Sequence, residues 1–245
     1  MRYLIIFLLA AGLAFPQWPI MRVIRRSAAA PSGPTFVNGG GDYSGGGAYT
    51  TTWSPTNGNT LIVWTLANDR TQTHTCSDGE GTGNTYTPDD PAGGAILAGG
   101  AISLVGRLFH AANVSGSGAY TITCTGATPA VAVIEISGNR SLDTVSAGAN
   151  PSASASLSSP STPTAFTPTT AATALIDGFG SVTGTTITLG QVGAGYTTNS
   201  SCQDGSSCFG GAMGYRIVSS SASYSDGWTW TGTDQGQVAI NAAYK

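Results

Sequence analysis

Acidic side chains gather in two short segments that carry the oxygen ligands a hard cation needs. Asp78 and Glu80 are separated by one glycine, and Asp89 and Asp90 are adjacent. Carboxylate oxygens are the ligands that Ca²⁺ prefers, so these four residues form a candidate structural calcium site. Their spacing differs from that of known calcium loops, and the alternative interpretation is a pair of solvated acidic turns.

Carboxylates also serve in pairs as the acid and base of glycoside hydrolases, and Glu135 adds a fifth candidate to the four residues above. The sequence gives no separation between carboxylates, so this chemistry stays a third hypothesis, as a calcium-dependent glycosidase. A catalytic triad is not indicated, because His74 and His110 are the only histidines and no Gly-x-Ser-x-Gly motif accompanies them. We therefore predict no catalytic residues, and no cofactor apart from the structural calcium.

Aromatic residues near the C-terminus suggest a different kind of site. Trp228 and Trp230 share one face of a predicted strand, and Tyr224 or Tyr43 could complete a platform on which sugar rings stack. The alternative is that both indoles face the core, where large apolar side chains on one strand face are usually buried.

The four cysteines form an even set that admits three pairings. Cys202 and Cys208 bracket a turn-rich loop that a disulfide would close locally, which leaves Cys76 and Cys124 to pair across a sheet. Zinc is the competing interpretation, but the chain has no Cys-x-x-Cys pair. Two disulfides favour an exported protein, secreted or on a cell surface.

The N-terminal sequence also indicates an exported protein. Arg2 and the apolar run over residues 3–15 resemble a secretory signal, and small residues at 12–14 and 28–30 offer cleavage positions. Extending the apolar run to Met21 approaches membrane-spanning length, and the arginines that follow at 22, 25 and 26 would oppose export. We expect residues 1–26 to be a signal peptide, with an uncleaved anchor or an assembly arm as alternatives, and residues 27–34 to be a linker.

Composition excludes one class of partner. Only 9% of the residues are charged, against about 25% in an average soluble domain, so Ser, Thr and Asn must solvate the surface. Beyond Arg26, five basic residues against twelve acidic ones leave a net charge of −7. Nucleic-acid binding through phosphate neutralisation is therefore not expected.

Short β-type runs between turn-rich segments predict one all-β domain over residues 35–245, an antiparallel sandwich of jelly-roll type. The apolar run Leu61–Trp64 predicts a central strand. Tyr120, Ile122 and Cys124 alternate with threonines, which predicts a strand with one buried face. The predicted strands cover residues 35–38, 49–53, 60–67, 72–76, 84–87, 101–111, 119–125, 130–137, 153–159, 174–179, 185–189, 213–219, 221–225, 228–231 and 237–244.

Two glycine-containing segments complete the local analysis. Asp226-Gly227 lies between two alternating runs and predicts a hairpin in which Ser225 pairs with Trp228. The glycine-rich stretch over residues 39–47 lacks the Lys-Ser/Thr ending of a phosphate-binding loop, and we interpret it as a flexible surface loop.

Seven short sequences occur in a characteristic order along the chain, at 59–64, 83–87, 108–114, 133–138, 142–144, 193–197 and 239–245. Their order resembles that of a family of secreted bacterial and phage-associated β-sandwich modules. The resemblance implies an exported or surface-exposed β-sandwich and brings no catalytic residues, and the loop between Cys202 and Cys208 departs from the family pattern.

We therefore expect a non-catalytic extracellular structural or adhesive module that binds a glycan or surface polymer. The alternative is a virion or extracellular filament subunit that self-associates through its N-terminal arm, residues 1–34. Membrane contact is expected only through residues 3–23, where these are not cleaved.

Overall fold

The computed structural model describes the chain from Ser32 onward, except for several loops. The described ranges are 32–67, 74–79, 83–89, 96–98, 104–116, 118–126, 130–150, 167–181, 188–192, 195–202, 210–224, 227–231 and 237–245. Their regular elements are all β-strands, and Gly33–Lys245 form one compact unit. The predicted signal or arm and the strand predicted at 153–159 lie outside the described residues.

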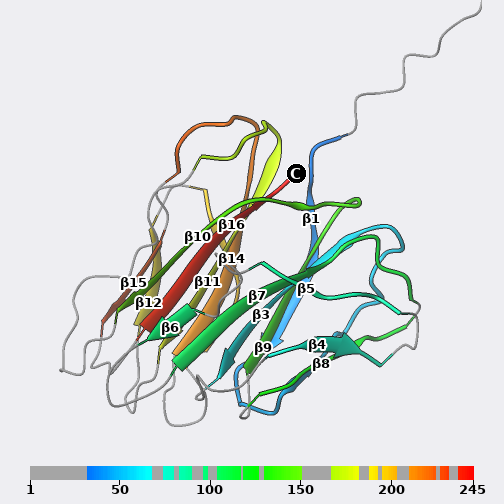
Figure 1. The fold of residues 1–245 in the computed structure, drawn as a ribbon, viewed down its shortest axis with the longest axis horizontal. Helices are drawn as coiled ribbons and strands as arrows, with labels where there is room; N and C mark the ends of the chain where they lie inside the picture. The colour runs from blue at the N-terminus through cyan, green and yellow to red at the C-terminus, as the bar shows by residue number, and fades with distance from the viewer. Residues whose placement is uncertain are drawn as a thin grey trace, which may run out of the picture. The chain divides into compact units, whose positions relative to one another are not determined.

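Two large antiparallel sheets form the body of this unit (Figure 1). The first sheet has the order β1 (Phe36–Asp42), β9 (Ala130–Ile136), β3 (Thr60–Ala67), β7 (Leu104–Ala111) and β5 (Thr87–Pro88), and β6 (Ile96–Ala98) also pairs with β7. The second has the order β10 (Leu142–Asn150), β16 (Gln237–Tyr244), β11 (Thr173–Ser181), β14 (Gly210–Val218) and β13 (Thr197–Cys202). The predicted all-β antiparallel sandwich is confirmed.

Two small sheets flank this body, which the prediction of only two sheets missed. One consists of β2 (Ala48–Thr50), β8 (Thr121–Cys124) and β4 (Cys76–Asp78), and the other of β12 (Thr188–Val192) and β15 (Gly227–Thr231). Figure 1 shows the two small sheets on opposite sides of the large ones. The alternation at Tyr120, Ile122 and Cys124 is confirmed, because these side chains are buried against the outer face of the first sheet.

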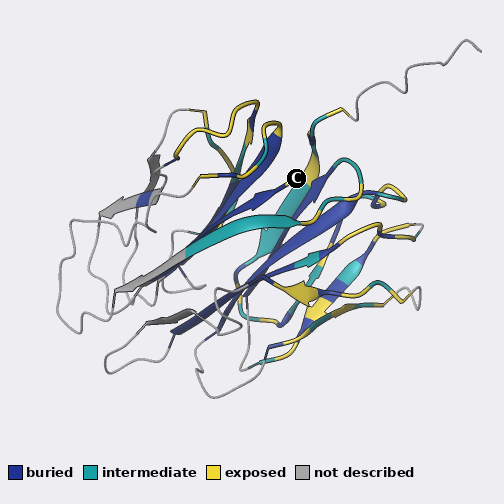
Figure 2. Cartoon of the chain, turned by 45° about the horizontal axis from the view of Figure 1, so that its top comes forward, coloured by how far each residue is buried: buried dark blue, intermediate teal, exposed yellow. Residues whose placement is uncertain are grey.

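The main core fills the space between the large sheets, where the buried strands lie in Figure 2. Trp64 of β3 is fully buried there. A Cβ atom added at Gly106 of β7 would lie 2.4 Å from the indole, and one added at Gly178 of β11 would lie 2.6 Å from it. The indole therefore occupies the room that two missing side chains leave, one on each sheet.

The two halves of the chain share one strand order in the described residues, except that β2 and β6 of the first half have no counterpart in the second. The sheet order β1-β9-β3-β7-β5 from the first half matches β10-β16-β11-β14-β13 from the second half when strands are paired in chain order. The flanking pair β4-β8 corresponds in the same way to β12-β15. Each half thus supplies one large sheet and the small sheet paired with it, an arrangement that an internal duplication would produce.

Strands that carry strong apolar patterns were predicted well, and weakly patterned edge strands were not. The predicted strands at 60–67 and 237–244 match β3 and β16, and β3 lies at the centre of its sheet as predicted. The edge strands β10 and β13 were missed, because Ser, Gly, Ala and Asn are poor strand formers.

Two local predictions were wrong. Gly39–Gly41, interpreted as part of a flexible loop, lie in β1, where an added Cβ at Gly39 would meet the Asn199 side chain at 1.9 Å. The glycines let Asn199 of the neighbouring sheet reach past β1 to the Val133 carbonyl at 3.1 Å. The hairpin is not formed as predicted, because residues 221–223 of its first strand lie outside any strand and Trp228 pairs with Gln191 of β12; Ser225 and Asp226 lie outside the described residues.

Candidate functional site

The candidate site begins with the short edge strand β5. Thr87 lies directly opposite His110 of β7, so the two side chains share one face of the sheet. Pro88 is the next residue of β5. An edge strand can contain a proline, because one row of its backbone groups has no strand to pair with. The backbone N–H of Asp89 donates to the Leu108 carbonyl at 2.8 Å and extends this contact by one residue.

Asp89 is buried with 2% of its surface exposed, and both of its carboxylate oxygens have partners. His110 Nδ1 lies 2.7 Å from Oδ1, and the Tyr244 hydroxyl donates to Oδ2 at 2.6 Å. An ionised carboxylate only accepts hydrogen bonds, so His110 carries a proton on Nδ1. In the neutral ring Nε2 is then an acceptor, and the half-buried His110 keeps 15% of its side-chain surface exposed.

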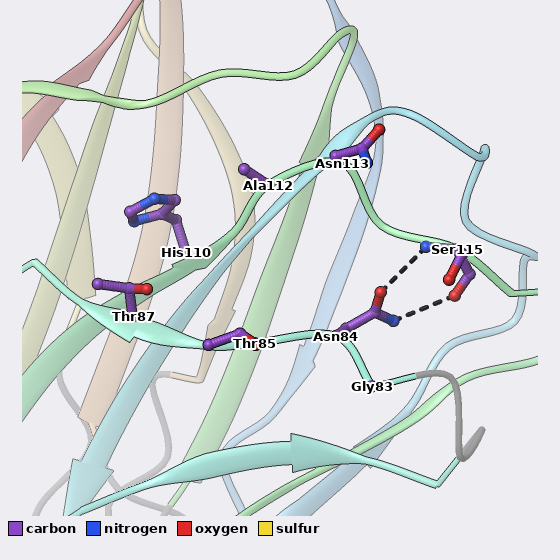
Figure 3. Close-up of a pocket in the computed structure, with 8 residues that line it drawn as sticks. All are labelled: Gly83, Asn84, Thr85, Thr87, His110, Ala112, Asn113 and Ser115. Carbon is purple, nitrogen blue, oxygen red and sulfur yellow. Dashed lines mark hydrogen bonds between the residues drawn. The ribbon is translucent and has the colours of Figure 1, made fainter.

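A shallow pocket of about 480 Å³ opens beside His110. Its walls come from two neighbouring segments, residues 83–87 and residues 110–115, as Figure 3 shows. The lining contains no Asp, Glu, Lys or Arg side chain among the described residues. The lining residues are Gly83, Asn84, Thr85, Thr87, His110, Ala112, Asn113 and Ser115.

Asn84 holds the pocket together. Its amide nitrogen donates to Asp78 Oδ2 at 2.8 Å and to the Ser115 carbonyl at 3.1 Å, and its oxygen accepts from the Ser115 N–H at 3.0 Å. These contacts tie the two wall segments to each other (Figure 3). Burial raises the pKa of Tyr86 above its ordinary value of 10.0, so its hydroxyl stays protonated and donates to Asp78 at 3.2 Å.

Three other lining side chains are available to a ligand. Thr85, Thr87 and Asn113 are exposed, and their side chains make no hydrogen bond within the described part of the chain. Asn113 has a φ of 55°, a left-handed conformation that asparagine adopts more readily than most residues. The pocket therefore presents hydroxyl and amide groups on a wall that Asn84 and the Asp89 network hold in place.

The structure does not assemble the predicted aromatic platform. Tyr43, Tyr224 and Trp228 are 4%, 8% and 2% exposed and belong to three different core clusters. Rings buried in separate clusters cannot present stacking faces together. The core alternative holds for Trp228, whereas the side chain of Trp230 lies outside the described residues.

The predicted calcium ligands do not meet in the described part of the chain. Asp78 accepts hydrogen bonds from Asn84 and Tyr86, and Asp89 is occupied by the His110 and Tyr244 donors. Among the described residues no group of three or more His, Cys, Asp or Glu side chains could hold a metal ion. Glu80 and Asp90 lie outside these residues.

Glu135, weighed as a glycosidase carboxylate, has a structural position. It is fully buried and accepts hydrogen bonds from the Trp53 indole at 3.0 Å, the Thr56 N–H at 2.8 Å and the Asn59 amide at 2.6 Å. Three donors fix this carboxylate against the loop before β3. It therefore anchors the fold and faces no pocket among those that the structure describes.

The cysteine predictions fall on two regions. Cys76 and Cys124 are directly paired between β4 and β8 and form the predicted disulfide. Cys202 is also disulfide-bonded, and its predicted partner Cys208 lies outside the described residues. The first bond closes a loop with a sequence separation of 48 and fastens the small sheet over its core cluster.

The Asp89–His110–Tyr244 network is the part of the site that the sequence did not show. In the sequence, Asp89 is a candidate calcium ligand or part of an acidic turn, and His110 is considered only as a possible member of a catalytic triad. Tyr244 is 155 residues from Asp89 in the chain and meets it only through the packing of β16 against β7. No local pattern encodes such a contact.

Comparisons with known proteins give no relative. No family model matches the chain, and neither a curated protein nor a solved structure matches it. Among the described residues no helix has the length and apolar character needed to cross a membrane.

Proposed function

We propose that this protein is a non-catalytic extracellular structural or adhesive module that binds a neutral glycan or surface polymer through the pocket beside His110. The observation that carries the proposal is the set of exposed polar side chains at Thr85, Thr87 and Asn113, which have no hydrogen-bond partner among the described residues. Together with the His110 Nε2 acceptor, these groups match the alternating donors and acceptors of sugar hydroxyls.

The lining also sets the charge and strength of the ligand. A wall without Asp, Glu, Lys or Arg favours an uncharged ligand over an ionic one. The pocket is open and its lining contains no Trp, Tyr or Phe, so little apolar area is buried on binding. We expect single-site dissociation constants near 1 mM, about −4 kcal/mol. Repeated sugar units or several copies of the protein would lower the apparent dissociation constant through avidity.

Two features support the extracellular, non-catalytic part of the proposal. The Cys76–Cys124 disulfide and the apolar N-terminal run both suit an exported protein. Activation of a hydroxyl as a nucleophile requires a hydrogen bond from that hydroxyl to a base. The Thr87 side chain lies directly opposite His110, but the structure shows no hydrogen bond between them.

A glycan array tests the proposal with matched variants. The double variant Thr87→Val and Asn113→Ala removes two polar groups from the pocket, and Thr167→Val makes the same kind of change at an exposed residue before β11. We expect wild type and Thr167→Val to bind the same neutral glycans and the double variant to lose them. Equal binding by all three proteins, or no binding by wild type, would contradict the proposal.

A further inference from the structure

Arg216 of β14 has surroundings that differ from those of the other described cations. Its guanidinium carbon lies 5.0 Å from the ring centre of Tyr224 and 5.9 Å from that of Tyr196. Both distances are within the range of cation–π contact. The two rings restrict the guanidinium while its side chain remains partly exposed.

Among the described residues, the hydrogen-bond donors of Arg216 have no acceptor. Arg107 donates to the His74 carbonyl, Arg140 to the Ser137 carbonyl, and Lys245 to Asp143. Among the described residues Arg216 makes no hydrogen bond or ion pair of this kind. A guanidinium with five N–H donors, held against two rings, therefore directs unused donors toward solvent.

The rings themselves are held in place. The Tyr224 hydroxyl donates to the Ser220 carbonyl at 3.1 Å, and its ring packs in a cluster with Leu175. Tyr196 packs against the same cluster. Gly195 adopts a φ of +94°, and a Cβ added there would lie 3.4 Å from Arg216 Nε, so this turn rests against the side chain.

We propose that Arg216 binds the carboxylate of an acidic sugar in a polysaccharide. A planar guanidinium fork fits a planar carboxylate with two parallel hydrogen bonds, and prior restriction of the side chain lowers the entropy lost on binding. The half-buried ring of Tyr196 offers an apolar face to the sugar, and the hydroxyls of Thr197 and Ser220 are exposed beside the two tyrosines. Aromatic and hydroxyl neighbours favour a uronic acid over an acidic peptide.

This site is separate from the pocket beside His110. β13 and β14 lie at the edge of their sheet that contacts β1, whereas β5 lies at the opposite edge of the first sheet. The net charge of −7 beyond Arg26 works against anionic ligands in general, so binding depends on this one arginine and weakens with added salt. The inference does not rest on the neutral-glycan proposal.

Isothermal titration with oligogalacturonate tests this site, with a neutral galactose oligomer of the same length as the matched ligand. We expect wild type to prefer the uronate by at least about tenfold, and Arg216→Gln to remove that preference. Arg216→Lys keeps the charge without the fork, so an intermediate affinity is expected. The pocket variant Thr87→Val should bind the uronate as wild type does.

Three results would overturn the inference. The first is equal affinity of wild type for the charged and neutral oligomers, which requires no variant and so cannot reflect misfolding. The second is unchanged uronate affinity in an Arg216→Gln variant that has the same melting temperature as wild type. The third is equally strong competition by a sulfated oligomer of the same length, which would show that the site binds anions in general and not carboxylates.

Discussion

The Tyr244 hydroxyl donates a 2.6 Å hydrogen bond to Asp89, which precedes it by 155 residues. This contact joins the last strand of the second large sheet to the segment after β5 in the first. Because Asp89 also orients His110, the same carboxylate links the two halves of the chain and sets one wall of the candidate pocket.

Replacing Tyr244 by phenylalanine tests that link. The variant keeps the ring in the core and removes one donor from a buried carboxylate, so we expect a loss of about 1–3 kcal/mol in the free energy of unfolding by urea. Tyr215→Phe is the matched control, because the Tyr215 hydroxyl makes no hydrogen bond within the described part of the chain. Equal losses in both variants would show that the Asp89 bond contributes nothing.

Gly178→Ala tests the packing around Trp64. The new Cβ would lie 2.6 Å from the indole of a fully buried side chain, so the sheets must move apart or the indole must leave its rotamer. We expect a loss of about 1–3 kcal/mol in urea unfolding. Gly79→Ala, where an added Cβ has no atom within 4 Å, should change stability by less than about 0.5 kcal/mol. A neutral effect at Gly178 would contradict the packing described above.

Asp143 gives a pH-dependent prediction. Desolvation raises the pKa of Asp143. Hydrogen bonds from Lys245 and Thr169, together with the Lys245 charge, lower it by more than desolvation raises it, so the pKa lies below the ordinary value of 3.8. A lowered pKa stabilises the fold above pH 3.8, and this contribution is lost as the pH falls through the native pKa. Asp143→Asn should therefore melt below wild type at neutral pH.

The comparison of melting temperatures should run from pH 7 into the acid range below pH 3.8. We expect the difference between wild type and Asp143→Asn to shrink as the acid range is entered. A difference that stays constant across the range would show that the substitution acts through packing and not through the charge of Asp143.

Strands could be predicted from the sequence where the pattern of apolar side chains is strong. Leu61–Trp64 are apolar on both faces, and β3 lies between two other strands. β10 and β13 have no such pattern in their own sequences. They form strands because they pair with β16 and β14, and a local sequence pattern does not show that pairing. Trp228 and Tyr224 illustrate a further limit, because alternation assigns a side chain to one face of a strand but does not say what covers that face. In the structure Trp228 packs in a cluster with Phe179 and Tyr224 in a cluster with Leu175, so both rings are buried against the second large sheet.

The candidate site was less accessible to sequence analysis than the fold. Thr87, Asp89 and His110 meet because β5 pairs with β7 across a connection that contains β6, and nothing in the short sequence around Pro88 indicates that register. The Cys76–Cys124 pair was predictable from the cysteine count and the proximity of Cys202 to Cys208. Partners fixed only by sheet packing, such as Asp89 and Tyr244, require the structure.

The central claim is that neutral sugars bind at the wall formed by Thr87, His110 and Asn113. Nuclear magnetic resonance can test it with neutral hexasaccharides of glucan, xylan and mannan, because the chain has only two histidines and the buried His74 serves as an internal reference. The account predicts that one of these sugars shifts the His110 imidazole and the Thr87 and Asn113 amide signals while His74 stays unchanged. Shifts that cluster elsewhere on the described surface, or none at 10-fold excess over the expected dissociation constant of about 1 mM, would contradict it.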